Sequence, residues 1–223
     1  MNETDYKVYC AGPLFNPAER EEMAAIAAVL KNAGYSVFLP QEDGLKFAVL
    51  VPVLMNRGIS IEEATKILNS AIFSLDVFEI MRCDGLVLNM NGRVPDEGAM
   101  VEAGIAWSHD KTVVIFKNDD RSLIHGNCNP LVMGLADFEF VGSYEEIPRA
   151  FDRKAAEVKA SDRVSALSRF ETANEKGEAI SHYLASRKSL GDITELLIKL
   201  FGEKSCLSRE EQSENFSPVQ GQR

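Results

Sequence analysis

Three carboxylates stand close together in residues 85–104, which read GLVLNMNGRVPDEGAMVEAG. Asp96 and Glu97 begin a predicted helix after a short apolar strand, and Glu102 lies one to two turns into that helix. The dipole of the helix N-terminus should help keep Glu102 ionised. An ionised carboxylate beside a cleft can act as a nucleophile toward an electrophilic sugar carbon. The same spacing is also typical of a helix cap at Asp96 and a solvated Glu102, so spacing alone leaves both interpretations open.

A fourth carboxylate, Asp76, lies within a dense apolar run over residues 72–81, which we expect to be buried. An acid in apolar surroundings is costly unless it is paired or protonated. Desolvation would raise the pKa of Asp76 toward neutrality, which suits a proton donor. The alternative is a structural role, either as a helix cap or as a salt bridge to Arg82.

The elements that would position these groups alternate as strand and helix over the first 150 residues. This alternation predicts a doubly wound α/β domain with five parallel strands. The carboxyl ends of parallel strands lie at one edge of the sheet, so the turns after them should form one crevice. The predicted strands cover residues 7–10, 36–39, 85–88, 112–116 and 138–141. The side chains and turns expected at the crevice are Tyr9, Gly12, Phe15, Gln41, Asp43 and Asp96.

Short capping signals predict where several helices begin and end. Asn16 followed by Pro17 predicts a helix start, and Gly34 predicts a left-handed helix end. Two further starts have the spacing of a capping box. They are Ser60 with Glu63, and Ser143 with Glu146.

Composition excludes several classes of partner. The chain has 223 residues, 45% of them hydrophobic, and a formal net charge of −10, which argues against binding a nucleic acid backbone. The start of the chain lacks the pattern of a signal peptide, and the longest apolar run, residues 47–55, is too short to span a membrane. We therefore expect a cytoplasmic protein with a small-molecule ligand and no membrane partner.

Common cofactor and metal motifs are missing from the sequence. It has no G-x-G-x-x-G, no G-x-x-x-x-G-K-[ST] and no G-x-S-x-G, which removes the main support for dinucleotide, P-loop and serine hydrolase hypotheses. Four cysteines and three histidines show no metal-ligand spacing. An oxygen-ligand Mg²⁺ site at Asp96 and Glu97 stays open as an alternative. Otherwise we expect neither a metal nor a cofactor.

Five blocks taken together resemble the nucleoside 2-deoxyribosyltransferase family. They are YCAGPLF at residues 9–15, LPQEDG at 39–44, Asp76, DEGAMVEAG at 96–104 and NPL at 129–131. The resemblance extends from residue 6 to about residue 145. It implies a flavodoxin-like fold and the transfer of 2-deoxyribose between purine or pyrimidine bases.

The resemblance also implies roles for individual residues. Glu102 matches the nucleophile that forms a covalent glycosyl-enzyme, Asp76 the acid that protonates the departing base, and Tyr9 the tyrosine beside the nucleophile. Asn129 matches an amide supplied by a neighbouring subunit, which implies a homo-oligomer with shared active sites. The other residues implied to contact substrate are Gly12, Phe15, Gln41, Asp96, Gly98 and Leu131.

The sequence departs from the family in two places. Residues 10–14 differ from the more aromatic, glycine-rich turn of bacterial members, which leaves the preference for purines or pyrimidines open. The chain also continues beyond the usual end. We expect a catalytic domain over residues 1–150, a helical extension over 151–202 and a disordered tail over 203–223.

Within the extension, the spacing predicts one helix over about residues 161–187. A second should begin with a capping box at Asp192 and Glu195 and end at Gly202. Its apolar stripe should pack against the domain or a second subunit rather than enter a membrane.

Three functional hypotheses follow from these observations. The first is the deoxyribosyltransferase. The second is an N-glycoside hydrolase of deoxynucleosides or nucleoside 5′-monophosphates, with water as the acceptor and with Asn16 and Arg20 as candidate phosphate ligands. The third is a non-catalytic nucleoside-binding or interaction module, against which the presence of Asp76, Asp96 and Glu102 argues.

Overall fold

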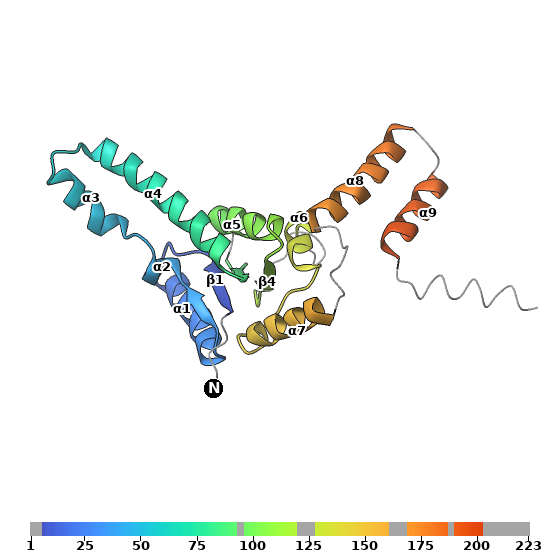
Figure 1. Ribbon diagram of the computed structural model, residues 1–223, viewed down its shortest axis with the longest axis horizontal. Coiled ribbons are helices and arrows are strands. Elements are labelled where there is room, and N and C mark those ends of the chain that lie inside the picture. The colour runs from blue at the N-terminus through green and yellow to red at the C-terminus, as the bar shows by residue number, and fades with distance from the viewer. Residues whose placement is uncertain (1–5, 93–95, 120–127, 161–168, 187–189, 203–223) are drawn as a thin grey trace, which may run out of the picture. The chain divides into compact units, whose positions relative to one another are not determined.

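The structure is a computed structural model that describes residues 6–92, 96–119, 128–160, 169–186 and 190–202 (Figure 1). The chain divides into two compact units, Met1–Ala166 and Leu167–Arg223. The first unit holds the sheet and the candidate site, and the second holds two helices of the predicted extension. The predicted disordered tail, residues 203–223, lies outside the described residues.

A parallel sheet of four strands forms the centre of the first unit, in the order β2-β1-β3-β4. Its strands are β1 (Lys7–Ala11), β2 (Ser36–Phe38), β3 (Gly85–Asn89) and β4 (Thr112–Phe116). Every residue of β3 and β4 is buried, as expected for a sheet covered on both faces. This arrangement confirms the predicted doubly wound α/β class.

The predicted fifth strand, residues 138–141, is wrong as a strand. Within the described residues it is reduced to a single parallel bridge between Val141 and Phe116 of β4. Asp137 and Phe138 both have positive φ values, 59° and 65°, so the backbone turns there instead of extending. Only Val141 then comes alongside β4, where its N–H donates to the carbonyl of Ile115 at 2.8 Å.

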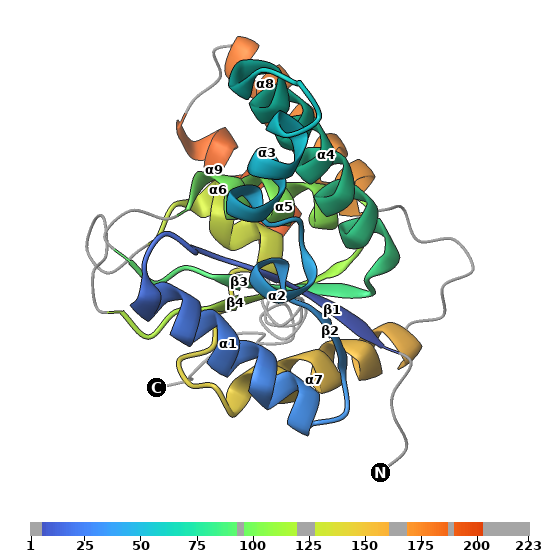
Figure 2. The same cartoon turned by 90° about the vertical axis from the view of Figure 1, so that its left-hand side faces the viewer.

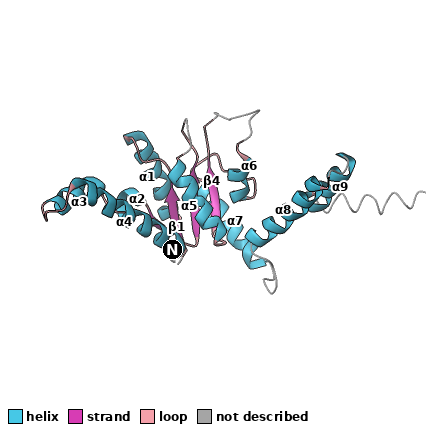
Figure 3. Cartoon of the chain, turned by 90° about the horizontal axis from the view of Figure 1, so that it is seen from above, coloured by secondary structure: helices cyan, strands magenta, loops and turns pink. Residues whose placement is uncertain are grey.

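Helices cover both faces of the sheet (Figure 2). Helices α1 (Pro17–Asn32) and α7 (Glu146–Ala160) pack on one face around Met23, Leu30 and Phe151. Helices α4 (Ile61–Arg82) and α5 (Glu97–Ser108) pack on the other, together with α6 (Pro130–Met133) and a 3-10 turn over Gly134–Ala136. The view from above looks onto the face of the sheet, where the strands lie side by side and α5 is drawn across them (Figure 3).

Most of the predicted capping signals act as expected. The Asn16 side chain and Glu19 form a complete capping box at the start of α1, with Pro17 as the first helical residue. Gly34 has φ of 93° just after that helix, which is the predicted left-handed end. Ser60 accepts a hydrogen bond from the N–H of Glu63 at the start of α4.

Two short helices follow β2. They are α2 (Pro40–Asp43) and α3 (Phe47–Met55), and α3 packs against α4. The expectation that residues 72–81 are all buried is wrong, because Phe73 is 66% exposed and Phe78 is 54% exposed. The guanidinium of Arg82 lies over the Phe78 ring, 5.3 Å from its centroid.

The extension contains α8 (Arg169–Ala185) and α9 (Leu190–Phe201). The predicted helix over residues 161–187 is described from Arg169 onward, and residues 161–168 lie outside the described part. Helix α9 begins at Leu190, so the predicted cap Asp192 instead lies in its first turn. The helix ends at Phe201, next to the predicted stop at Gly202. No described helix is long and apolar enough to cross a membrane.

Candidate active site

A cavity of about 820 Å³ opens at the carboxyl edge of the sheet, as the parallel topology predicts. The turn after β1, helix α2, the start of α3, the middle of α4 and the start of α5 form its walls. Seven of the residues implied to act or bind line it. They are Gly12, Phe15, Gln41, Asp76, Asp96, Gly98 and Glu102.

Tyr9 joins two of the carboxylates in this cavity. Its side chain is fully buried in β1, and its ring stacks on Phe38 with the ring centroids 5.3 Å apart. The hydroxyl donates a hydrogen bond to Glu102 Oε1 at 2.8 Å and also interacts with Asp76. A fixed phenol therefore brings together a carboxylate of α4 and a carboxylate of α5.

Burial dominates the protonation of this group. Desolvation raises the pKa of Glu102 to about 8, while the hydrogen bond from Tyr9 lowers it and the charges of Asp76 and Asp96 raise it. Desolvation also raises the pKa of Asp76, as predicted, against the hydrogen bond from Tyr9. Burial of Glu102 therefore opposes the ionisation that the helix dipole favours.

The structural alternatives for Asp76 do not hold. Arg82 pairs with Glu79 at 3.2 Å, and Glu79 also accepts from Lys7 at 2.6 Å, so Arg82 is not the ion-pair partner of Asp76. Asp76 lies in the interior of α4 and so does not cap it. What remains is a half-buried carboxyl group that faces the cavity and Glu102.

Asp96 is both a helix cap and a residue of the cavity, the two roles that the sequence left open. Its Oδ1 accepts a hydrogen bond from the N–H of Ala99 at 2.6 Å, so Asp96 caps α5. The same carboxylate lines the cavity. Because a carboxylate accepts several hydrogen bonds, the cap leaves it able to bind a ligand hydroxyl. The cap also fixes where α5 begins and therefore where Glu102 points.

Gly12 and Gly98 allow close approach for different reasons. A Cβ atom on Gly12 would lie 2.5 Å from Met23 Sδ and 2.9 Å from Asn89 Cβ, so the turn after β1 packs tightly on α1 and β3. A Cβ atom on Gly98 would meet Asp96 Oδ1 at 3.1 Å, next to the cavity. A side chain at Gly98 would therefore crowd the Asp96 carboxylate directly.

Two cations and an amide form the end of the cavity away from α5. The Gln41 Nε2 donates to the carbonyl of Arg20 at 2.9 Å, and its Oε1 is buried without a partner among the described residues. The Arg20 guanidinium donates to the carbonyl of Leu14 at 2.9 Å, and Lys46 lines the same wall. Sequence reasoning missed Lys46, since a single lysine before an apolar run carries no distinctive signal.

Asn129 and Leu131 are not among the residues that line this cavity. Asn129 caps α6, and its Oδ1 accepts from the N–H of Leu131 at 2.9 Å. Both side chains are at least partly exposed, Leu131 to 82%. Within one chain, therefore, these two predicted contacts are not brought to the carboxylates.

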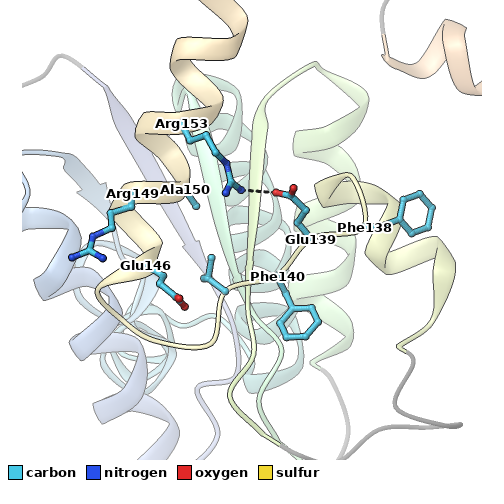
Figure 4. Close-up of a pocket in the computed structure, with 8 residues that line it drawn as sticks. Phe138, Glu139, Phe140, Glu146, Arg149, Ala150 and Arg153 are labelled. Atoms are coloured by element: carbon cyan, nitrogen blue, oxygen red, sulfur yellow. Dashed lines mark hydrogen bonds and ion pairs between the residues drawn. The ribbon is translucent and has the colours of Figure 1, made fainter. Parts of the chain in front are cut away.

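A second hollow of about 550 Å³ lies between residues 138–141 and α7 (Figure 4). It contains none of the predicted site residues. Arg153 pairs there with Glu139 at 2.5 Å. Glu146 accepts from the N–H groups of Gly142 and Ser143, which is one half of the predicted capping box, while α7 itself begins at Glu146. The charged groups of this hollow are thus engaged in local structure, and we place the candidate site at the carboxylate-lined cavity.

No metal centre is evident in the described part of the chain. No three His, Cys, Asp or Glu side chains there come together as metal ligands, and this includes the Asp96 and Glu97 region.

Comparison with known proteins identifies the family of this chain. The family model for nucleoside 2-deoxyribosyltransferases matches residues 8–180, so the chain belongs to that family. No curated protein matches this chain in sequence.

Several solved structures are similar to this chain. A conserved protein from Enterococcus faecalis V583 is 22% identical, with a TM-score of 0.50 over 68% of this chain and 99% of its own. A 2-deoxyribosyltransferase from Bacillus psychrosaccharolyticus is 20% identical, with a TM-score of 0.47 over 63% of this chain and 89% of its own. A CMP N-glycosidase from Clostridium botulinum is 16% identical, with a TM-score of 0.34 over 66% of this chain and 98% of its own.

Proposed function

We propose that the protein transfers 2-deoxyribose between nucleobases by cleaving the N-glycosidic bond of 2′-deoxynucleosides. The observation that carries this proposal is the contact of the buried Tyr9 hydroxyl with both Glu102 and Asp76 inside one cavity. Two carboxyl groups that flank an anomeric carbon are the usual machinery for glycoside cleavage with retention. Membership of the deoxyribosyltransferase family supports the same reaction.

In the first half-reaction Glu102 attacks the anomeric carbon and forms a covalent glycosyl-enzyme. The N-glycosidic bond breaks, its electron pair moves to the ring nitrogen of the base, and Asp76 gives that nitrogen its proton. In the second half-reaction a different base attacks the same carbon and releases Glu102, while Asp76 takes a proton back. Two inversions give net retention. A 2′-deoxy sugar suits this route because the oxocarbenium-like transition state forms more easily without the 2′-hydroxyl.

The reactive form needs Glu102 ionised and Asp76 protonated. Burial raises the pKa of Glu102 to about 8, which opposes its ionisation at neutral pH. We infer that the bound nucleoside favours the reactive form, because positive charge develops beside Glu102 and the base excludes water from Asp76. The Tyr9 hydroxyl can donate to Glu102 or to Asp76. It can therefore stabilise whichever of the two carboxyl groups is ionised.

Asp96 and Gln41 would orient the substrate. Asp96 lines the cavity at the start of α5, where its carboxylate can accept hydrogen bonds from the sugar hydroxyls. The Oε1 of Gln41 is a buried acceptor, so it suits an amino group on the base. Gly98 keeps the backbone beside Asp96 open to the sugar.

The site is proposed to be shared between subunits. Asn129 and Leu131 lie outside the cavity of their own chain and are accessible, so they could be presented to a neighbour. Phe73 and Phe78 form an exposed apolar surface on the helix that carries Asp76. A homo-oligomer would cover this surface. The proposed role is nucleobase salvage in the cytoplasm, without a cofactor.

A second candidate is a glycosidase acting on nucleoside 5′-monophosphates. The observation that favours it is the pair of cations, Arg20 and Lys46, that line the cavity although the chain as a whole carries a net charge of −10. A phosphate is the natural counter-charge for such a pair. Water would then replace the second base as the acceptor.

One incubation separates these functions. Deoxyadenosine with and without cytosine is followed by chromatography, and deoxyadenosine 5′-monophosphate is tested in parallel. New deoxycytidine supports the transferase, and adenine formed without cytosine shows hydrolysis. Cleavage of the monophosphate alone, with KM raised about tenfold or more in Lys46→Gln, supports the second candidate. Absence of turnover under all three conditions contradicts both.

A further inference from the structure

The helical extension does not enclose a core of its own. Helices α8 and α9 run antiparallel, because Lys176 Nζ lies 4.8 Å from the ring centroid of Phe201 while Tyr183 contacts the backbone of Ile193. None of the described side chains of either helix is buried. Two helices of this length seldom stay ordered in water without further packing. Something else should therefore cover them.

Helix α9 is apolar on two sides. Ile193, Leu196 and Leu200 are half-buried, as expected for the side that packs on α8. Leu197, Ile198 and Phe201 are 40%, 56% and 58% exposed and form a second row next to the first. An apolar surface this wide is typical of a helix inside a bundle rather than one at its edge.

Helix α8 presents a row of small residues beside this surface. Ala173, Gly177 and Ser181 recur every four residues, and Leu184, 66% exposed, follows at the end of the row. A Cβ atom added to Gly177 would meet no other atom within 4 Å, so the space above the middle of the row is open. Each row lies about a quarter turn around its helix from the contact between α8 and α9. Because the two helices run antiparallel, both rows face the same side of the hairpin.

We propose that a second copy of the chain covers this side, hairpin against hairpin, in a four-helix bundle. A two-fold axis sets the bulky row of each α9 on the small row of the partner's α8, so one surface is complementary to itself. The charged residues of α9, Asp192, Glu195 and Lys199, lie on its opposite side by helical periodicity, and the contact buries no charge from them.

The area supports a copy-to-copy contact. Leu184, Leu197, Ile198 and Phe201 are each at least 40% exposed. Covering them and the small row on both copies removes on the order of 1,000 Å² from water, which is about the smallest area of a specific protein interface. This association is separate from the catalytic proposal, because it uses only residues of the extension and its test does not measure turnover.

Photo-crosslinking in the full-length chain tests the proposal. Benzoylphenylalanine replaces the exposed Ser181 in one protein and the exposed Glu175, on the other side of α8, in a matched control. We expect a covalent dimer from the Ser181 position whose joined peptide includes residues 190–202 of the second copy. Mixing ¹⁵N-labelled and unlabelled chains should give a product with one labelled half. The Glu175 position should give no dimer.

A second pair of variants uses the same readout. Leu197→Asp should lower the crosslink from the Ser181 position about tenfold, because a buried unpaired charge opposes the contact. Glu195→Ala, on the charged side of α9, should leave it unchanged. Circular dichroism must show equal helix content in both. Crosslinks from the Ser181 position to residues 6–160 of the same chain would overturn the proposal. So would the absence of a crosslinked dimer at a high protein concentration, on the order of 100 µM.

Discussion

The hydroxyl of Tyr9 donates a hydrogen bond to Glu102 Oε1 at 2.8 Å, across the boundary between β1 and α5. The two residues are 93 positions apart in the sequence. They meet because β1 pairs with β3, and the turn after β3 leads into α5. The Tyr9 ring cannot rotate away, because it is fully buried and stacked on Phe38. The hydrogen bond therefore holds the carboxylate in one place and favours its ionised form.

Tyr9→Phe should slow the reaction and move its pH profile. Without the phenol both Glu102 and Asp76 lose a donor that lowers their pKa values, so the kcat/KM profile should move to higher pH. A hydrogen bond to a charged group is worth roughly 1.5–3 kcal/mol, which corresponds to a loss of about 10- to 100-fold near pH 7. Tyr35→Phe is the control, since its hydroxyl donates to Asp152, and neither residue is part of the cavity. An unchanged profile in Tyr9→Phe would show that the contact has no catalytic role.

Asp76→Asn tests the assigned proton donor. Natural nucleosides should react far more slowly, while substrates whose leaving groups need no proton should lose little rate. The alkaline limb of the kcat/KM profile should disappear, because the amide that replaces the carboxyl group has no acidic proton to lose. Glu62→Gln, exposed on the same helix, controls for changes of charge in α4. Equal losses for both kinds of substrate would sink the assignment.

The raised pKa of Glu102 also predicts how stability changes with pH. The ordinary value is 4.5 and the folded value is about 8, so between these pH values the folded chain holds a proton that the unfolded chain has released. The stabilisation is complete below the unfolded value and is lost as pH rises through about 8.

Glu102→Gln removes this dependence. The melting temperature of the variant, compared with that of wild type, should rise as the pH increases from 5 to 8. The corresponding change in the free energy of unfolding is on the order of a few kcal/mol. The exposed Glu97→Gln should follow wild type over the same range. If the melting temperatures of wild type and Glu102→Gln changed equally with pH, Glu102 would not be desolvated in the folded protein.

A mixing experiment tests whether Asn129 acts on a neighbouring subunit. Glu102→Ala and Asn129→Ala are purified separately, each nearly inactive, and their subunits are exchanged. If Asn129 acts in trans, a mixed dimer has one site with both lesions and one site with neither, so activity returns. If it acts within its own chain, every site keeps a lesion. No recovery, once native mass spectrometry has shown mixed oligomers, counts against a shared site.

Local patterns were enough to predict the arrangement of the carboxylates. Helical spacing fixes the separation of Asp96 and Glu102, and parallel pairing brings the ends of β1 and β3 to one edge of the sheet. The apolar surroundings of Asp76 already marked it as a candidate proton donor, but only the family resemblance implied that it acts together with Glu102.

Other features depend on contacts that a sequence does not show. The pKa of Glu102 follows from burial by distant segments, and the 66% exposure of Phe73 depends on which segments pack around α4. The predicted fifth strand does not form because Asp137 and Phe138 have positive φ angles, which residues other than glycine rarely adopt. Helix α9 begins at Leu190, three residues before Ile193, the first helical residue that a cap at Asp192 predicts.

The central claim is that Glu102 becomes covalently bonded to the sugar, and trapping the glycosyl-enzyme tests it most directly. The protein is incubated with a 2-fluoro nucleoside, which turns over slowly, and is then digested for mass spectrometry. We predict the mass of one sugar on a peptide that contains Glu102, and no label on Glu102→Ala. That variant should also lose several orders of magnitude in rate. Label on a different residue, or transfer activity that persists in Glu102→Ala, would contradict the account.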